Sequence, residues 1–107
     1  MAIFELRHYK IQPGKMDQWL EFMEDEIIPF AISNGAVLNG SFRAVEDETS
    51  YIWLRRFESQ QEKERIYQAI YESDQWKSHF SPKIGELIDR SQTEIKELTP
   101  TSRSPLQ

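Results

Sequence analysis

Two short segments of the sequence alternate charged and aromatic side chains in a pattern suited to binding an anion. Glu5, Arg7 and Tyr9 alternate in the first segment, and Trp53 and Arg55 alternate in the second. A guanidinium group matches a carboxylate or an enolate because it donates two parallel hydrogen bonds. Tyr and Trp rings can stack on an aromatic ligand. Alternating residues of a strand share one face, so we expect these five side chains to meet on one side of a sheet.

A structural role for the same residues stays open at this stage. Glu5 can pair with Arg7 or with Arg55 across neighbouring strands, and such a pair would only close the interior of the protein. Ion-pair networks of this kind perturb charged groups much as active sites do. The sequence therefore predicts a charged cluster without deciding between a ligand site and a structural ion pair.

His79 is the sixth candidate, and it lies beside Trp76 and Phe80. We expect it at the rim of the cavity formed by the cluster, where it could act as a general base or an axial metal ligand. A packed or capping histidine is the alternative. The other histidine, His8, is expected to point toward the helices. The sequence has no glycine-rich phosphate loop, Ser-His-Asp pattern or HExxH motif. No catalytic residue, metal site or cofactor is therefore predicted.

The spacing of apolar residues and turn formers predicts four strands and two long helical regions. Pro13-Gly14 ends the first strand, and Ser59 with Glu62 forms a capping box that begins the second helical region. Gly40 indicates a bulge in the second strand, and Pro29 should kink or end the first helix. The predicted elements are strands at residues 3–11, 36–46, 51–57 and 91–98, helices at 14–34 and from 59, a break at 73–76 and a helical turn from 81.

This order, β-α-β-β-α-β, predicts a ferredoxin-like α+β fold in which an antiparallel sheet carries both helices on one face. Strands one and three should lie at the centre of the sheet. Both faces of these strands carry large apolar residues, and we assign Ile52 and Leu54 to the helix-covered face. Tyr9, Trp53 and the charged cluster would then lie on the uncovered face. A second copy of the sheet is the simplest cover for that face, so we expect a homodimer.

Length and composition limit the class of protein. The chain has 107 residues, which fits one domain, and we place the domain at residues 1–98 with a flexible tail at 99–107. The net charge of −5 disfavours binding to nucleic acid. There is no cysteine, so thiolate chemistry and disulfides are excluded. No apolar run approaches the roughly 20 residues of a membrane span, and no signal peptide is recognisable. We expect a cytoplasmic protein.

The sequence resembles the NIPSNAP family over about residues 3–98. The segment FELRHYKIQPGKMDQWLEF is similar to the N-terminal signature of that family, and YIWLRRFESQQEKE and SDQW resemble two further motifs. The resemblance implies a dimeric α+β barrel. It implies no single activity, because roles around vesicles and mitochondria are proposed in animals and mostly none is assigned in bacteria. The third strand of the family often has His and Trp where this chain has Trp53 and Arg55, which puts a shared strand chemistry in doubt.

Three functional hypotheses follow. The first is a small aromatic or anionic ligand bound in a cavity on the sheet face by Glu5, Arg7, Tyr9, Trp53, Arg55 and His79. The second is a cofactor-independent monooxygenase- or isomerase-like enzyme, by analogy with the fold superfamily. In it Arg7 or Arg55 would stabilise an enolate, and His79 or Tyr9 would move a proton. The third is a purely structural or partner-binding dimer. A cavity of at least about 300 Å³ would favour the first two.

Overall fold

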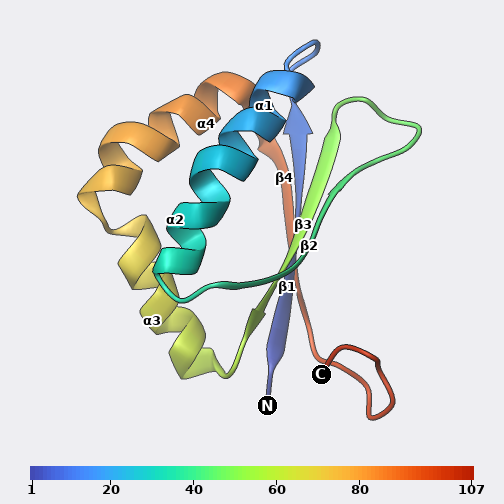
Figure 1. Cartoon of the computed structure of the whole chain (residues 1–107). Helices are drawn as coiled ribbons and strands as arrows, with labels where there is room; N and C mark the ends of the chain where they lie inside the picture. The colour runs from blue at the N-terminus through green and yellow to red at the C-terminus, as the bar shows by residue number, and fades with distance from the viewer.

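The computed structural model describes all residues 1–107 as an antiparallel sheet with helices packed on one face. Figure 1 shows this two-layer arrangement, with the helices on one side of the sheet and none on the other. The predicted order of elements and the single helix-covered face are confirmed. No helix is both long enough and apolar enough to cross a membrane. The strands are β1 (Ile3–Ile11), β2 (Val37–Arg43), β3 (Ser50–Phe57) and β4 (Ile88–Leu98), the helices are α1 (Met16–Phe22), α2 (Ile28–Ser33), α3 (Gln60–Tyr71) and α4 (Ser81–Leu87), and the π-helical segments are η1 (Met23–Ile27) and η2 (Trp76–Phe80).

The sheet has the order β2-β3-β1-β4, so strands β1 and β3 are central as predicted. The register between β2 and β3 shifts between Leu38 and Gly40, which confirms the predicted bulge. The pairing of β1 with β4 has a larger irregularity. His8 pairs with Glu94 and Lys10 pairs with Asp89, so residues 90–93 of β4 stand opposite Tyr9 alone. Bulges re-aim side chains and are frequent beside functional sites.

The helices cover the opposite face of the sheet from the one we predicted. Tyr9 and Trp53 lie under the helices, and Tyr9 contacts Trp19 of α1 with a ring-centroid distance of 5.6 Å. Ile52 and Leu54 lie on the other face and are only half-buried. The prediction was wrong because both faces of β1 and β3 are apolar. The larger aromatic side chains fill the deeper helix-facing layer, and the aliphatic ones form the open face.

Both helical regions contain a π-helical segment that ends two residues before a proline. Ile28 donates its N–H to Met23 O, five residues earlier, and Pro29 follows. Segment η2 precedes Pro82 in the same way. Proline lacks an N–H and its ring crowds the carbonyl four residues before it, and a widened turn relieves that crowding. The predicted continuous helix at 14–34 is therefore interrupted before Pro29.

Helix α3 begins at the predicted capping box. The Ser59 side chain accepts a hydrogen bond from the N–H of Glu62 at 3.1 Å. We expect Ser59→Ala to lower the free energy of unfolding by about 1 kcal/mol, because one N–H at the start of the helix loses its acceptor. Urea unfolding measures this change. Ser102→Ala, in the C-terminal tail, is the control and should change the stability by less than about 0.5 kcal/mol; equal effects of the two substitutions would contradict the capping role.

The C-terminal tail, Thr99–Gln107, folds back against the open face of the sheet (Figure 1). Arg56 donates to the main-chain oxygen of Gln107 at 2.6 Å. The tail lies over Phe4, which is only 4% exposed although it belongs to the open face. Our expectation of a flexible tail stays a prediction. The structure adds that the tail has an apolar surface to pack against, which its own sequence does not reveal.

Candidate functional site

Glu5 is the centre of a buried charged cluster between the sheet and helix α3. One carboxylate oxygen, Oε1, accepts from Arg7 Nε at 2.6 Å and from Arg55 Nη2 at 2.5 Å. The other, Oε2, accepts from the Tyr67 hydroxyl and lies 3.3 Å from Lys63 Nζ. Glu5 and Arg55 are both 0% exposed, and they pair directly across strands β1 and β3. The ion pair that the sequence left open therefore exists, and it joins Glu5 to both arginines.

The surrounding cations determine the ionisation of Glu5. Burial by itself would raise the pKa of this carboxyl group. The charges of Arg55 and Arg7 and the hydrogen bonds from Arg55 and Tyr67 outweigh burial, and the pKa falls to about 2. Glu5 is therefore a carboxylate over the whole neutral range, and it holds its partners rather than exchanging protons with them.

Arg55 is enclosed by aromatic rings as well as by its carboxylate partner. Its guanidinium carbon lies 4.6 Å from the ring centre of Trp53 and 5.4 Å from that of Phe57. The Tyr67 and Tyr71 rings lie at 5.5 and 5.8 Å. Arg55 Nε and Nη1 are buried and have no hydrogen-bond partner, so the electron-rich faces of these rings supply their electrostatic partner. Arg55 is thus a structural cation inside the core.

Arg7 connects this cluster to the neighbouring space. Its Nε donates to Glu5, its Nη2 donates to the Tyr67 hydroxyl at 2.8 Å, and its Nη1 donates to the Tyr9 hydroxyl at 3.4 Å. A guanidinium group has five N–H donors, so two remain after these three contacts. Unlike Arg55, Arg7 is only partly buried. It can therefore donate to a bound molecule without giving up its contacts inside the protein.

Tyr9 also has an unused donor. Its hydroxyl oxygen accepts from Trp53 Nε1 at 3.1 Å and from Arg7 Nη1. These two bonds occupy both lone pairs of the oxygen. No protein group accepts the hydroxyl hydrogen of Tyr9, even though the residue is buried, with only 8% of its surface exposed. An acceptor atom on a ligand would complete the hydrogen bonding of Tyr9.

Arg7 and Tyr9 line a cavity of about 170 Å³ beside the irregular part of β4. Residues 90–93, which stand opposite Tyr9 alone, open the space between β4 and the helices and supply two of the lining side chains. None of the lining residues is acidic. The cavity is smaller than the roughly 300 Å³ that would favour a ligand site or an enzyme over a filled interior, so any ligand of this cavity must be a small molecule. The lining residues are Arg7, Tyr9, Trp76, Ile84, Ile88, Arg90 and Thr93.

The structure brings together five of the six residues that the sequence proposed. Glu5, Arg7, Tyr9, Trp53 and Arg55 form one connected network, but on the helix-covered face rather than the open one, for the packing reason given above. Only two of them, Arg7 and Tyr9, line the cavity. Their role in binding a ligand stays a prediction.

The structure does not place His79 at the rim of the cavity, and it agrees with the alternative, a packed histidine. Its Nε2 lies 2.7 Å from Glu26 Oε1, and its ring packs against Phe22 and Phe80 on the outer side of the helices. The π-helical turn η2 places it there, away from the cavity lining. His8 was also assigned to the wrong face: it lies beside Ser50, 3.0 Å from Ser50 Oγ, and shares the open face with Ile52.

Sequence reasoning missed several residues of the site. Tyr67 was not among the candidates, yet its hydroxyl accepts from Arg7 and donates to Glu5. Trp76 marked a break between helices, and its position over the cavity had no local signal. Arg90 and Thr93 reach the cavity through the irregularity of β4. The sequence offered one hint of this irregularity: strand β4 begins directly after helix α4, and its residues 89–94 are all polar.

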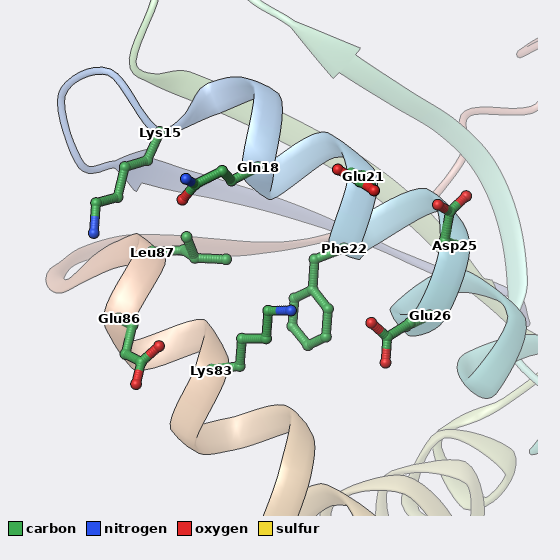
Figure 2. Close-up of a pocket in the computed structure, with 9 residues that line it drawn as sticks. All are labelled: Lys15, Gln18, Glu21, Phe22, Asp25, Glu26, Lys83, Glu86 and Leu87. Carbon is green, nitrogen blue, oxygen red and sulfur yellow. The ribbon is translucent and has the colours of Figure 1, made fainter.

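A second hollow lies on the outer surface, between α1–η1 and α4. Figure 2 shows charged side chains from both helical regions around it, with Lys83 close to the ring of Phe22. The hollow has a volume of about 360 Å³, and Lys83 Nζ lies 4.6 Å from the Phe22 ring centre. Its acidic side chains include Glu21 and Asp25, which are exposed to solvent. No group of three side chains in the structure is arranged to hold a metal ion.

Comparison with known proteins agrees with this architecture. The model of the NIPSNAP family matches residues 4–105, which is nearly the whole chain. The chain belongs to the NIPSNAP family. The match continues past Leu98 into the tail, so the family similarity includes most of the segment that folds back on the open face of this NIPSNAP protein. No curated protein matches the sequence.

Solved structures of NIPSNAP family proteins have the same fold as this chain. A NIPSNAP family protein from Agrobacterium tumefaciens is 28% identical, with a TM-score of 0.86 and 100% of each chain covered. A second protein of that organism, described as a NIPSNAP family protein with unknown function, is 29% identical, with a TM-score of 0.85 over 99% of this chain and 94% of the other. SnoaB from Streptomyces nogalater, a cofactor-independent oxygenase, is 13% identical, with a TM-score of 0.71 over 97% of each chain. At that identity SnoaB shares the fold alone.

Proposed function

We propose that this NIPSNAP protein binds a small anionic molecule with a flat apolar body in the cavity between strand β4 and the helices. The observation that carries the proposal is the pair of unused donors at Arg7 and Tyr9 in a cavity without a carboxylate. Buried donors are normally paired, so an unpaired one beside a cavity favours a ligand with an acceptor. The anion would accept from both groups at once.

The other lining residues indicate the shape of the ligand. The Trp76 ring and the side chains of Ile84 and Ile88 supply apolar walls, which suit a flat or compact hydrocarbon group. A volume of about 170 Å³ corresponds to about five or six water molecules at roughly 30 Å³ each. This size favours an aromatic acid with a single ring, or a smaller acid, over a larger metabolite.

Tyr9→Phe tests the proposal with little change in shape. We expect the substitution to weaken the binding of benzoate by roughly tenfold, because one hydrogen bond to an anion is lost. Tyr51→Phe is the matched control. Tyr51 stacks on Tyr9 at 6.3 Å and its hydroxyl hydrogen bonds to Ser41 Oγ at 2.5 Å, but it does not line the cavity. Isothermal titration calorimetry on both folded variants measures the effect. Equal affinity of the two variants for benzoate would contradict a ligand site at Tyr9.

The enzyme hypothesis stays a weaker alternative. It needs a group that moves a proton, and His79 contacts Glu26 instead of the cavity, which leaves Tyr9 as the one proposed proton carrier there. The third hypothesis, an interior filled by side chains, agrees with the buried Glu5–Arg55 pair. Native mass spectrometry of the protein purified without added ligand distinguishes the binding proposal from a filled interior. A reproducible extra mass supports the binding proposal, whereas a bare protein that also fails to bind benzoate supports the filled interior.

We also propose that two copies associate through their open sheet faces. Leu6, Ile52 and Leu54 are half-buried on that face, and Phe42 beside Ile52 is 56% exposed. An apolar patch of this kind usually marks an interface, and a two-fold axis lets one patch cover the other. The tail lies near Phe4 and Leu54 at one end of the face, and Ile52 and Phe42 do not line the hollow that it forms, so this part of the sheet stays available to a partner.

A further inference from the structure

Positive charges outnumber negative charges around the cavity, and the excess is seen first among the partners of Glu5. Three cations, Arg7, Arg55 and Lys63, lie within ion-pair distance of this one carboxylate. Lys63 has a second partner in Glu97. Two carboxylates therefore serve three cations, and no other carboxylate lies within ion-pair distance of them. One positive charge stays uncompensated. Arg7 is the member of this group that lines the cavity.

Arg90, an exposed residue, brings a second guanidinium group without a carboxylate partner to the open side of the same cavity. Its Nη2 donates to the main-chain oxygen and, at 3.1 Å, to the hydroxyl of Ser81 at the start of α4. These contacts fix the guanidinium group between β4 and the helix, while its Nε and Nη1 have no partner in the protein. Arg90 makes no ion pair. Fixing an arginine through one nitrogen leaves the remaining N–H groups free for a ligand.

The cavity thus combines two guanidinium groups with two neutral donors, the hydroxyls of Tyr9 and Thr93, and no acidic residue. Arg7 shares its one carboxylate, Glu5, with Arg55 and Lys63, and Arg90 has no carboxylate partner. The chain as a whole has a net charge of −5, so this local surplus of positive charge runs against its composition. A monocarboxylate would compensate only one of the two arginines. A dianion would compensate both, and guanidinium forks match phosphate oxygens as well as they match carboxylates.

We infer that the ligand of this cavity carries a compact dianionic head of the phosphate-monoester type, with its organic group toward Trp76. The inference rests on the proposed function, because it names the class of anion taken by the same site. Arg7 would bind the head from the β1 side and Arg90 from the β4 side. With a volume of about 170 Å³, the cavity has room for a tetrahedral head and a small group attached to it.

Calorimetry with two probes of similar body and different charge tests the inference. At pH 8, we expect phenyl phosphate to bind at least about tenfold more tightly than benzoate, since it engages both arginines. Lowering the pH to 5 should remove most of this advantage, because the second phosphate proton has a pKa of about 6. Malonate, a compact dicarboxylate, separates the effect of the second charge from that of tetrahedral phosphate geometry. We expect phenyl phosphate to bind more tightly than malonate, and a preference for malonate would overturn the assignment of a phosphate-monoester head.

Arg90→Gln shows whether the second charge acts where we place it. We expect about a tenfold loss of affinity for phenyl phosphate and less than about a threefold loss for benzoate. Arg103→Gln removes a cation from the tail on the other face and should change neither affinity. Arg90→Lys, which keeps the charge, should recover part of the loss. Thermal unfolding checks that each variant is folded. The pH dependence of phenyl phosphate binding is measured on the unmodified protein, so it tests the inference even if a variant fails to fold.

Two further kinds of result would overturn the inference, and they are distinguishable from failure of the proposed function. If benzoate binds as tightly as phenyl phosphate, the dianionic head is wrong while the anion site stands. If Arg90→Gln and Arg103→Gln affect phenyl phosphate equally, the phosphate binds elsewhere as an adventitious ion only. If no anion binds at all, the proposed function itself fails.

Discussion

Replacing Glu5 by alanine is expected to lower the free energy of unfolding by about 3 to 5 kcal/mol. Glu5 is the one carboxylate that contacts Arg7 and Arg55, and it is fully buried with Arg55. Without it, Arg55 would stay in the core as a charge with no counterion, enclosed by aromatic rings. Breaking a buried ion pair from one side leaves an unpaired buried charge, which is the large unfavourable contribution. Urea unfolding followed by circular dichroism measures the loss.

Glu97→Ala is the matched control, because it removes another carboxylate that contacts Lys63. Glu97 lies at the surface with about half of its side chain exposed. Exposed ion pairs contribute between about 0 and 1 kcal/mol, so this variant should lose less than about 1 kcal/mol. A loss in Glu5→Ala as small as that in Glu97→Ala would mean that the buried cluster contributes little to stability.

The pH dependence of unfolding gives an independent measure of the same carboxylate. The folded protein holds the pKa of Glu5 at about 2, below its ordinary value of 4.5. The folded state therefore binds fewer protons than the unfolded state between these values. The stabilisation is fully present above pH 4.5 and is lost as the pH falls toward 2. The difference of about 2.5 pKa units corresponds to about 3 kcal/mol.

Other carboxyl groups contribute to the same acid range, so Glu5→Ala serves as the reference. The pKa of Asp47 is lowered by hydrogen bonds from Lys10, Ser50 and Thr49, and that of Asp89 by hydrogen bonds from neighbouring side chains. These effects persist in the variant. The stability of Glu5→Ala should therefore fall less steeply between pH 4.5 and 2 than that of the unmodified protein, and parallel curves would contradict the role of Glu5.

Replacing Ile52 by glutamate is expected to raise the dissociation constant of the proposed dimer by more than about a hundredfold. Ile52 lies on the central strand β3, on the open face, between His8 of β1 and Phe42 of β2. A two-fold axis places the substitution on both sheets, so two charges enter one apolar interface. Sedimentation velocity over a range of protein concentrations measures the shift from dimer to monomer.

Ile32→Glu provides a control of identical chemistry at another site. Ile32 is an apolar residue of helix α2 that is 54% exposed and lies on the helical side of the molecule. The same isoleucine-to-glutamate change there should leave the dissociation constant within about threefold of its original value. If the unmodified protein sediments as a monomer at all concentrations, or if the two variants behave alike, the open face is not the interface.

The alternation of residues was sufficient to predict the layers of the fold and the grouping of the charged cluster. Strands β1 and β3 are neighbours in the sheet, so side chains that alternate on each strand must meet when the registers align. This follows from the two-residue period of a strand. The capping box at Ser59 and the bulge near Gly40 were also predictable, because each depends on a few adjacent residues.

The face on which the cluster lies was decided by tertiary packing. The sequence shows large apolar side chains on both faces of the central strands, and charged residues such as Glu5 normally indicate a solvated face. The cluster is buried under the helices because Tyr67 and Lys63 of α3 complete the hydrogen bonds and charges of Glu5. That compensation depends on where the helix docks, which no local pattern in the strands records.

The cavity is likewise a product of the tertiary structure. Arg7 and Arg90 are far apart in the chain, and they line one space because β4 departs from regular pairing opposite Tyr9. Local sequence determined the strands, the helices and their caps, since these depend on side-chain period and on neighbouring residues. Only the folded chain decided which charges are compensated, since ion pairing depends on distances between segments that the sequence separates.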